Sequence, residues 1–253
     1  SSISGTSMAG PYISGTIGLL LSHQPSLTQN KIREIIRHGI DFYGSDIPKP
    51  DLYMGEGRVN IFKALSLVTS DAISDAIAVI HEPKDEKIVS GVLPIEITAS
   101  GNFILKFAKG IYPSQWEIIS TGGEIDKKIA AQIDTLNYID GVYTLKLEVN
   151  DLRGMNWDIT TIEVDNVKIL KPYNNDYVNL NDIIEINALV PSESEYIFEY
   201  APISNPDQWS SRGISANIEN GVINGVWDTS DLVQGTYHLR LKAKYRGIES
   251  EDI

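Results

Sequence analysis

The chain has 253 residues, with a hydrophobic share of 42% and a charged share of 22%, a composition typical of a folded protein with more than one core. Its net charge of −13 would repel phosphate backbones, so nucleic acid is excluded as an expected partner. It has no cysteine, which excludes disulfides and thiolate metal sites, and no apolar run reaches the roughly 18 residues that a membrane span needs.

The first 70 residues have the periodicity of helices. Residues 8–21 mix Ile and Leu with Gly, Ala and Ser and are apolar on most sides, which predicts a buried helix that its neighbours pack closely. A second helix is predicted by an N-cap, a hydrophobic staple, an apolar face and a closing glycine. These markers are Thr28, Leu27 with Ile32, Ile35 with Ile36, and Gly39.

A third, short helix is expected over residues 60–68. Three helices with few strands cannot form a sheet of their own. Residues 1–70 are therefore expected to be a piece of a larger α/β domain.

From about residue 77 the hydrophobic period changes to two, which predicts half-buried strands separated by turns. This part also repeats itself at spacings of 93 or 94 residues. The matching segments are 113–116 with 206–209, 134–135 with 228–229, and 141–147 with 235–241. Two copies of about ninety residues predict two antiparallel β-sandwiches of the immunoglobulin or fibronectin type III kind. Polar residues at 69–71 and 165–166 are the expected boundaries, which gives modules at 77–165 and 166–253.

Residues 5–11, Gly-Thr-Ser-Met-Ala-Gly-Pro, are the chemically specific string of the chain. They lie where a loop would enter the first helix, and the unpaired amides and positive dipole end of a helix N-terminus stabilise an oxyanion. Gly5 lets a substrate approach the backbone, and Pro11 cannot donate to the carbonyl of Ser7. The residues alone leave two interpretations of Ser7, a nucleophile or an ordinary helix cap.

The string and the residues around it resemble a known signature. Residues 5–15 resemble the segment around the active-site serine of the subtilisin family, in which Gly-Thr-Ser-Met-Ala, a small residue and Pro precede two variable positions, a small residue and Gly. Residues 55–64 resemble the family's Gly-x-Gly, Val-Asn and Ala pattern at the start of its closing helix. The resemblance implies that Ser7 is the nucleophile of a serine endopeptidase and its amide one oxyanion donor. It also implies that residues 1–70 end a subtilisin-like α/β domain that cleaves proteins or peptides.

A serine hydroxyl needs a histidine to take its proton and a carboxylate to orient that histidine. His23 lies sixteen residues beyond Ser7, about 24 Å along a continuous helix. His38 lies near a helix end, His81 and His238 lie in the repeats, and His238 is expected to point outward. None of the four is expected to be the base. Because the subtilisin triad runs Asp, His, Ser along the chain, the resemblance implies that the Asp, the His and the oxyanion asparagine all lie upstream.

The chain opens on Ser1 without an initiator methionine or the pattern of a signal peptide, so a fragment is expected. The fragment alone is expected to lack peptidase activity, and its parent to be an extracellular or cell-surface enzyme. Two other functions remain as alternatives. One is adhesion or substrate binding by the modules beside a non-functional protease remnant, and the other is a structural spacer.

Two groups of residues have a binding interpretation and a structural one. The acidic clusters at 41–51, 174–176 and 181–182 lack the regular ligand spacing of a calcium loop, which favours solvated turns over structural calcium. No other cofactor is expected. Trp116 and Trp209, with Tyr143 and Tyr237, recur at equivalent positions, which favours core and corner aromatics. The alternative is a platform for polysaccharide or the cell surface.

Overall fold

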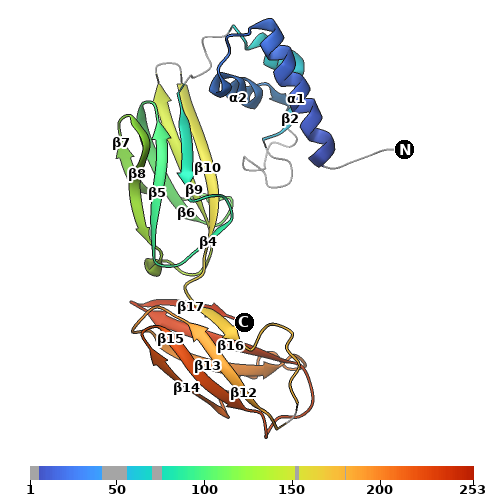
Figure 1. Cartoon of the computed structure of the whole chain (residues 1–253), viewed down its shortest axis with the longest axis vertical. Coiled ribbons are helices and arrows are strands. Elements are labelled where there is room, and N and C mark those ends of the chain that lie inside the picture. Colours follow the sequence, from blue (N-terminus) through green and yellow to red (C-terminus); the bar gives the residue numbers. More distant parts are fainter. Residues whose placement is uncertain (1–5, 42–55, 70–75, 152–153, 180) are drawn as a thin grey trace, which may run out of the picture. The chain divides into compact units, whose positions relative to one another are not determined.

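The structure of the chain is a computed structural model that describes residues 6–41, 56–69, 76–151, 154–179 and 181–253. It is mostly β-sheet with few helices (Figure 1). Its contacts divide it into two compact units. The first comprises Ser1–Lys84, Ile95–Ala131 and Thr144–Thr160, and the second comprises Asp85–Pro94, Gln132–Tyr143 and Thr161–Ile253.

The first unit begins with three helices and a two-stranded sheet. These elements are α1 Thr6–His23, α2 Gln29–His38, β1 Ile40–Asp41, β2 Arg58–Val59 and α3 Ile61–Ser66. Strands β1 and β2 pair antiparallel. The N-cap prediction for α2 is confirmed, because the Thr28 hydroxyl accepts a hydrogen bond from the Lys31 amide at 3.2 Å. Asn60 caps α3 in the same way, accepting from the Lys63 amide at 3.1 Å.

One small core holds the three helices together. Its buried members are Leu20, Ile32, Ile35, Ala64 and Val68, with Ile17, Leu27, Ile36, Leu65 and Leu67 packed against them. The predicted inner face of the second helix is thus confirmed. Gly39 does end α2, with its amide donating to the Ile35 carbonyl at 2.8 Å. Its φ is −86°, so what requires glycine there is a close approach: a Cβ would lie 2.7 Å from the Cα of Ala64.

The first helix, which the sequence predicts to be buried within a larger domain, is covered on one side only in the described residues. Most of α1 is exposed, including Tyr12 with 68% and Leu19 with 47% of the residue accessible, whereas Leu20 and Thr16 are fully buried. Contacts to α3 cover only one side of the helix. Composition predicted a helix apolar all round, but only the side that meets the small core is covered.

In the described residues from 76 to 164, the helices are followed by eight strands. They are β3 Ala78–Glu82, β4 Lys87–Val89, β5 Val92–Ala99, β6 Asn102–Lys109, β7 Glu117–Gly122, β8 Ile125–Asp134, β9 Gly141–Asp151 and β10 Gly154–Val164. A five-stranded sheet has the order β4-β10-β9-β6-β7, and a three-stranded sheet has the order β3-β5-β8. Strand β6 shows the predicted period of two, with Phe103, Leu105 and Phe107 buried and their neighbours partly exposed.

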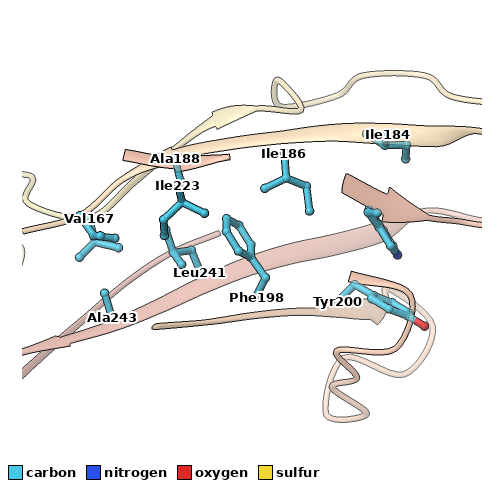
Figure 2. Packing of buried hydrophobic residues seen from close by; sticks show 11 residues of the cluster. Val167, Ile184, Ile186, Ala188, Phe198, Tyr200, Ile223, Leu241 and Ala243 are labelled. Carbon is cyan, nitrogen blue, oxygen red and sulfur yellow. The ribbon is translucent and has the colours of Figure 1, made fainter. Parts of the chain in front are cut away.

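Seven more strands lie in the second unit. They are β11 Lys168–Lys171, β12 Ile183–Leu189, β13 Glu195–Pro202, β14 Ile214–Glu219, β15 Val222–Asp228, β16 Tyr237–Tyr245 and β17 Ile248–Asp252. They form one sheet with the order β11-β12-β15-β14 and another with the order β13-β16-β17. Figure 2 shows apolar side chains from both sheets meeting in one layer, among them Ile186, Ile223, Phe198 and Leu241. This is a two-layer β-sandwich.

The same hydrogen bonds recur at an offset of 94 residues. The hydroxyls of Tyr143 and Tyr237 donate to the carbonyl four residues earlier, at 2.8 and 2.9 Å, which confirms the prediction of corner tyrosines. The tryptophans differ from the prediction. Trp116 and Trp209 are half-buried outside the core, with Lys146 Nζ 6.0 Å from one ring centroid and Arg240 Cζ 3.6 Å from the other. A cation covers these rings instead of apolar side chains.

The link between β10 and β11 is held by Asp140. Its two carboxylate oxygens accept the amides of Asn166 at 3.0 Å and Val167 at 2.9 Å. The buried Asn166 side chain also donates to the Thr135 carbonyl at 2.9 Å. Burial of Asp140 raises its pKa, although the two linker amides and Ser250 act to lower it.

Candidate active site

Ser7 is the second residue of α1 and is exposed. Its backbone amide is one of the four N–H groups at a helix start that have no partner within the helix. No acidic residue lies in the first turn, so the positive end of the helix dipole is not neutralised there. Pro11 lies inside the helix and has no N–H to donate to the Ser7 carbonyl. Gly5, the first residue of the string, lies outside the described residues.

Two of the four histidines have hydrogen-bond partners other than Ser7. Helix α1 is continuous from Ser7 to His23, which separates the two by about 24 Å. The Nδ1 of His38 lies 2.9 Å from the Glu34 carbonyl, and the Nε2 of His81 lies 2.8 Å from the Thr98 hydroxyl. His238 is exposed on β16, as predicted. Among the described residues no histidine hydrogen-bonds to Ser7.

The second motif, residues 55–64, builds a cluster around Asp41, although its Gly55 lies outside the described residues. Gly57 has a φ of +137°, and a Cβ there would lie 2.8 Å from the Asp41 carbonyl oxygen. The Asp41 carboxylate accepts from Lys63 Nζ at 2.6 Å and from Asn60 Nδ2 at 3.0 Å. It also pairs with Arg58 at 3.3 Å. The motif therefore joins the end of α2 to the start of α3.

This cluster corrects part of one prediction. Asp41 was expected in a solvated acidic turn, but it lies in β1 with three side-chain donors around its carboxylate. The spacing of the acidic residues gave no sign of these partners, because they come from the motif about twenty residues later. Residues 42–51 of the predicted cluster lie outside the described residues.

The Asp41 cluster makes part of the stability depend on pH. The hydrogen bond from Lys63, followed by that from Asn60, lowers the pKa of Asp41 from 3.8 to about 2. Because the folded pKa lies below the unfolded one, the stabilisation is complete above the unfolded value and is lost as the pH falls from 3.8 to about 2. Thermal unfolding between pH 5 and about pH 2 is expected to show Asp41→Asn below wild type at the upper end, with the two curves converging toward the lower end. A constant difference across this range would contradict the assignment.

The other acidic clusters form exposed turns where they are described. Asp176 accepts the Tyr173 amide at 2.7 Å, and Asp182 accepts the Asn179 amide at 3.1 Å. Within the described part of the chain, no group of three or more His, Cys, Asp or Glu residues is arranged to hold a metal ion. No helix in that part is both long and apolar enough to cross a membrane.

Comparison with known proteins bears on the first 60 residues most directly. Residues 1–60 match the protein family described as the Subtilase family. The chain is 24% identical over 259 aligned residues to Bacillopeptidase F of Bacillus subtilis, covering 95% of this chain and 16% of that protein. It is 43% identical over 63 residues to the Thermostable alkaline protease of Halalkalibacterium halodurans, covering 25% of this chain and 16% of that protein. The chain is related to proteases.

The chain spans 16% of the length of each of these two relatives. Among solved structures, titin Ig tandem domains match over 71% of this chain and 95% of that one, with 12% identity and a TM-score of 0.24. Bovine butyrophilin matches over 71% of this chain and 97% of that one, with 9% identity and a TM-score of 0.25.

Proposed function

We propose that residues 1–70 are the C-terminal segment of a subtilisin-like serine endopeptidase domain and that Ser7 is its nucleophile. Two β-sandwich modules, 77–165 and 166–253, follow this segment. The observation that carries the proposal is the exposed position of Ser7 in the first turn of α1, within the stretch that matches the Subtilase family. A helix start combines an accessible hydroxyl with amides that have no partner in the helix.

In this role the Ser7 Oγ attacks the carbonyl carbon of a peptide bond while a histidine takes the hydroxyl proton. The C–N bond then breaks, the proton passes to the leaving amine, and an ester to Ser7 remains. Water hydrolyses the ester and restores the hydroxyl. The Ser7 amide helps to hold the negative charge on the carbonyl oxygen in both steps.

The histidine, the aspartate and the asparagine donor of the oxyanion hole come from polypeptide that precedes Ser1 in the parent protein. The four histidines of this chain lie in the places described above, none of them bonded to Ser7 in the described structure. We expect the chain by itself to be inactive, and the parent to act on proteins or peptides outside the cell or at its surface.

Covalent labelling tests this assignment. A fluorophosphonate probe reacts with a serine hydroxyl that a neighbouring base activates. We expect the probe to label the parent protein at Ser7, identified by peptide mass spectrometry, and to leave the isolated chain unlabelled. Labelling of the isolated chain would show that no upstream base is needed. Labelling of the parent at another serine would remove Ser7 from the site.

A second function rests on the tryptophans. Trp116 and Trp209 occupy repeat-related positions and are half-buried, each with a cation near one side of the ring, and an aromatic ring that is accessible on its other side can stack on a sugar. This observation favours polysaccharide or cell-surface binding by the modules. A pull-down of residues 77–253 on insoluble polysaccharide, with Trp116→Ala and Trp209→Ala as controls, separates binding modules from a spacer that binds nothing.

A further inference from the structure

Arg37, at the end of α2, reaches the start of β10. Its Nη1 donates to the Trp157 carbonyl at 2.7 Å and lies 3.4 Å from the Asn156 side-chain oxygen. The guanidinium carbon lies 4.3 Å from the centroid of the Trp157 ring. A planar guanidinium is suited to stacking on an indole while its N–H groups donate to oxygens in its own plane. One side chain thus makes two kinds of contact with the same strand.

The charge of Arg37 is compensated on the helical side. Its Nη1 pairs with Glu34 at 3.0 Å and its Nε with Glu56 at 2.9 Å. The side chains of Arg37 and Glu34 are only 13% and 2% exposed. Burial raises the pKa of Glu34 above its ordinary value, although Arg37 acts to lower it. A buried carboxylate depends on its cation, so Arg37 cannot leave this position without exposing or protonating Glu34.

On the strand side, the residues next to the contact are also fixed by hydrogen bonds. Asn156 is 4% exposed, and its Nδ2 donates to the Ala76 carbonyl at 2.6 Å, where the chain enters the first sandwich. Asp158 accepts the Ile80 amide at 2.9 Å. The contact surface therefore also holds the incoming backbone in place.

The second copy of the repeat provides an internal comparison. At an offset of 94 residues, Asp252 corresponds to Asp158 and likewise accepts a backbone amide, that of Ile169, at 2.6 Å. The position of Trp157 is taken by Glu251, which lies 3.9 Å from Arg240 of its own sandwich. The two copies thus share the carboxylate that binds the first strand. They differ at both positions that meet Arg37, because Ser250 and Glu251 stand where the first copy has Asn156 and Trp157.

We infer that the start of β10 is a docking surface for α2, and that Arg37 joins the helical segment and the first sandwich into one cooperatively unfolding unit. The first sandwich then stabilises the helical segment that carries Ser7. This inference does not depend on the chemistry of Ser7, because none of its contacts involves that residue.

Hydrogen exchange of the 253-residue chain, read by mass spectrometry, tests the coupling from both sides. Arg37→Met keeps the aliphatic stem and removes the charge. We expect it to raise the opening of β10 amides on the order of tenfold. Trp157→Ala is expected to raise the opening of α2 amides to a similar extent. The double variant is expected to do no more than the larger single change.

Two matched variants control for general destabilisation. Arg33→Met alters the same helix, but Arg33 is 49% exposed and 3.6 Å from its partner Asp158, so a much smaller effect on β10 is expected. Trp209→Ala removes a tryptophan under a cation in the second unit and is expected to leave α2 unchanged. If Arg37→Met opens only the helices, or if the two single effects simply add, the inference is wrong. The test remains decisive even if Arg37→Met unfolds the helical segment, because the hydrogen-exchange protection of the β10 amides is still measured.

Discussion

Replacement of Ser7 by alanine in the parent protein is expected to lower peptide hydrolysis by at least about 10⁴-fold. The change removes the oxygen that forms the ester in the proposed mechanism. Substrate binding does not need the hydroxyl, so the loss is expected in kcat with KM nearly unchanged. Initial rates on a peptide substrate under saturating and limiting conditions separate the two constants.

Ser22→Ala is the matched control for this variant. Ser22 lies in the last turn of the same helix and donates to the Leu19 carbonyl at 2.8 Å, so the change removes a hydroxyl from α1 away from the proposed site. Its activity is expected to stay within about twofold of wild type, since an exposed hydroxyl contributes little. Full proteolysis after Ser7→Ala, with the helix intact by circular dichroism, would overturn the proposed function.

Replacement of Trp227 by alanine is expected to destabilise the second sandwich by about 3–5 kcal/mol. The residue is 5% exposed, and its ring centroid lies 4.8 Å from that of Tyr200 and 6.4 Å from that of Tyr237. Alanine would leave a cavity between the two sheets. Urea unfolding, followed by the fluorescence of the remaining tryptophans, gives the change in the free energy of unfolding.

Trp227→Phe refines this prediction. The indole Nε1 of Trp227 is buried without a hydrogen-bond partner among the described residues, which costs free energy that phenylalanine does not incur. Phenylalanine also keeps an aromatic ring against Tyr200. A loss of under about 1.5 kcal/mol is therefore expected. Equal losses for the alanine and phenylalanine variants would mean that the ring does not fill the core.

Local signals predicted local structure well. The cap of α2 was predicted because a Thr side chain at a helix start reaches only the amides of the following turn. The period of two in β6 and β16 predicted which side chains face inward, including the outward position of His238. Gly39 was predicted to end its helix, but the reason for glycine there is the close approach of Ala64, which lies 25 residues later and leaves no local signal.

Contacts between distant residues could not be predicted. The Arg37 and Trp157 pair is 120 residues apart, and each residue alone is compatible with an ordinary solvated surface. The exposure of α1 also depends on what packs against it, which amino-acid composition does not specify. For the candidate site, the assignment of Ser7 as nucleophile came from the sequence and stays a prediction. The sequence did not predict the cluster that connects Asp41 to the second motif.

The hydrogen bonds that Asp140 accepts from the linker between β10 and β11 bear on how well that linker resists proteolysis. Endopeptidases bind their substrates as extended chain, so a scissile segment must first come away from its surroundings. The amides of Asn166 and Val167 are engaged by one carboxylate, and the Asn166 side chain is anchored in the sandwich before it. Cutting at this joint would require all of these bonds to break together. A linker held in this way is expected to resist endopeptidases better than a linker whose backbone has no such partners.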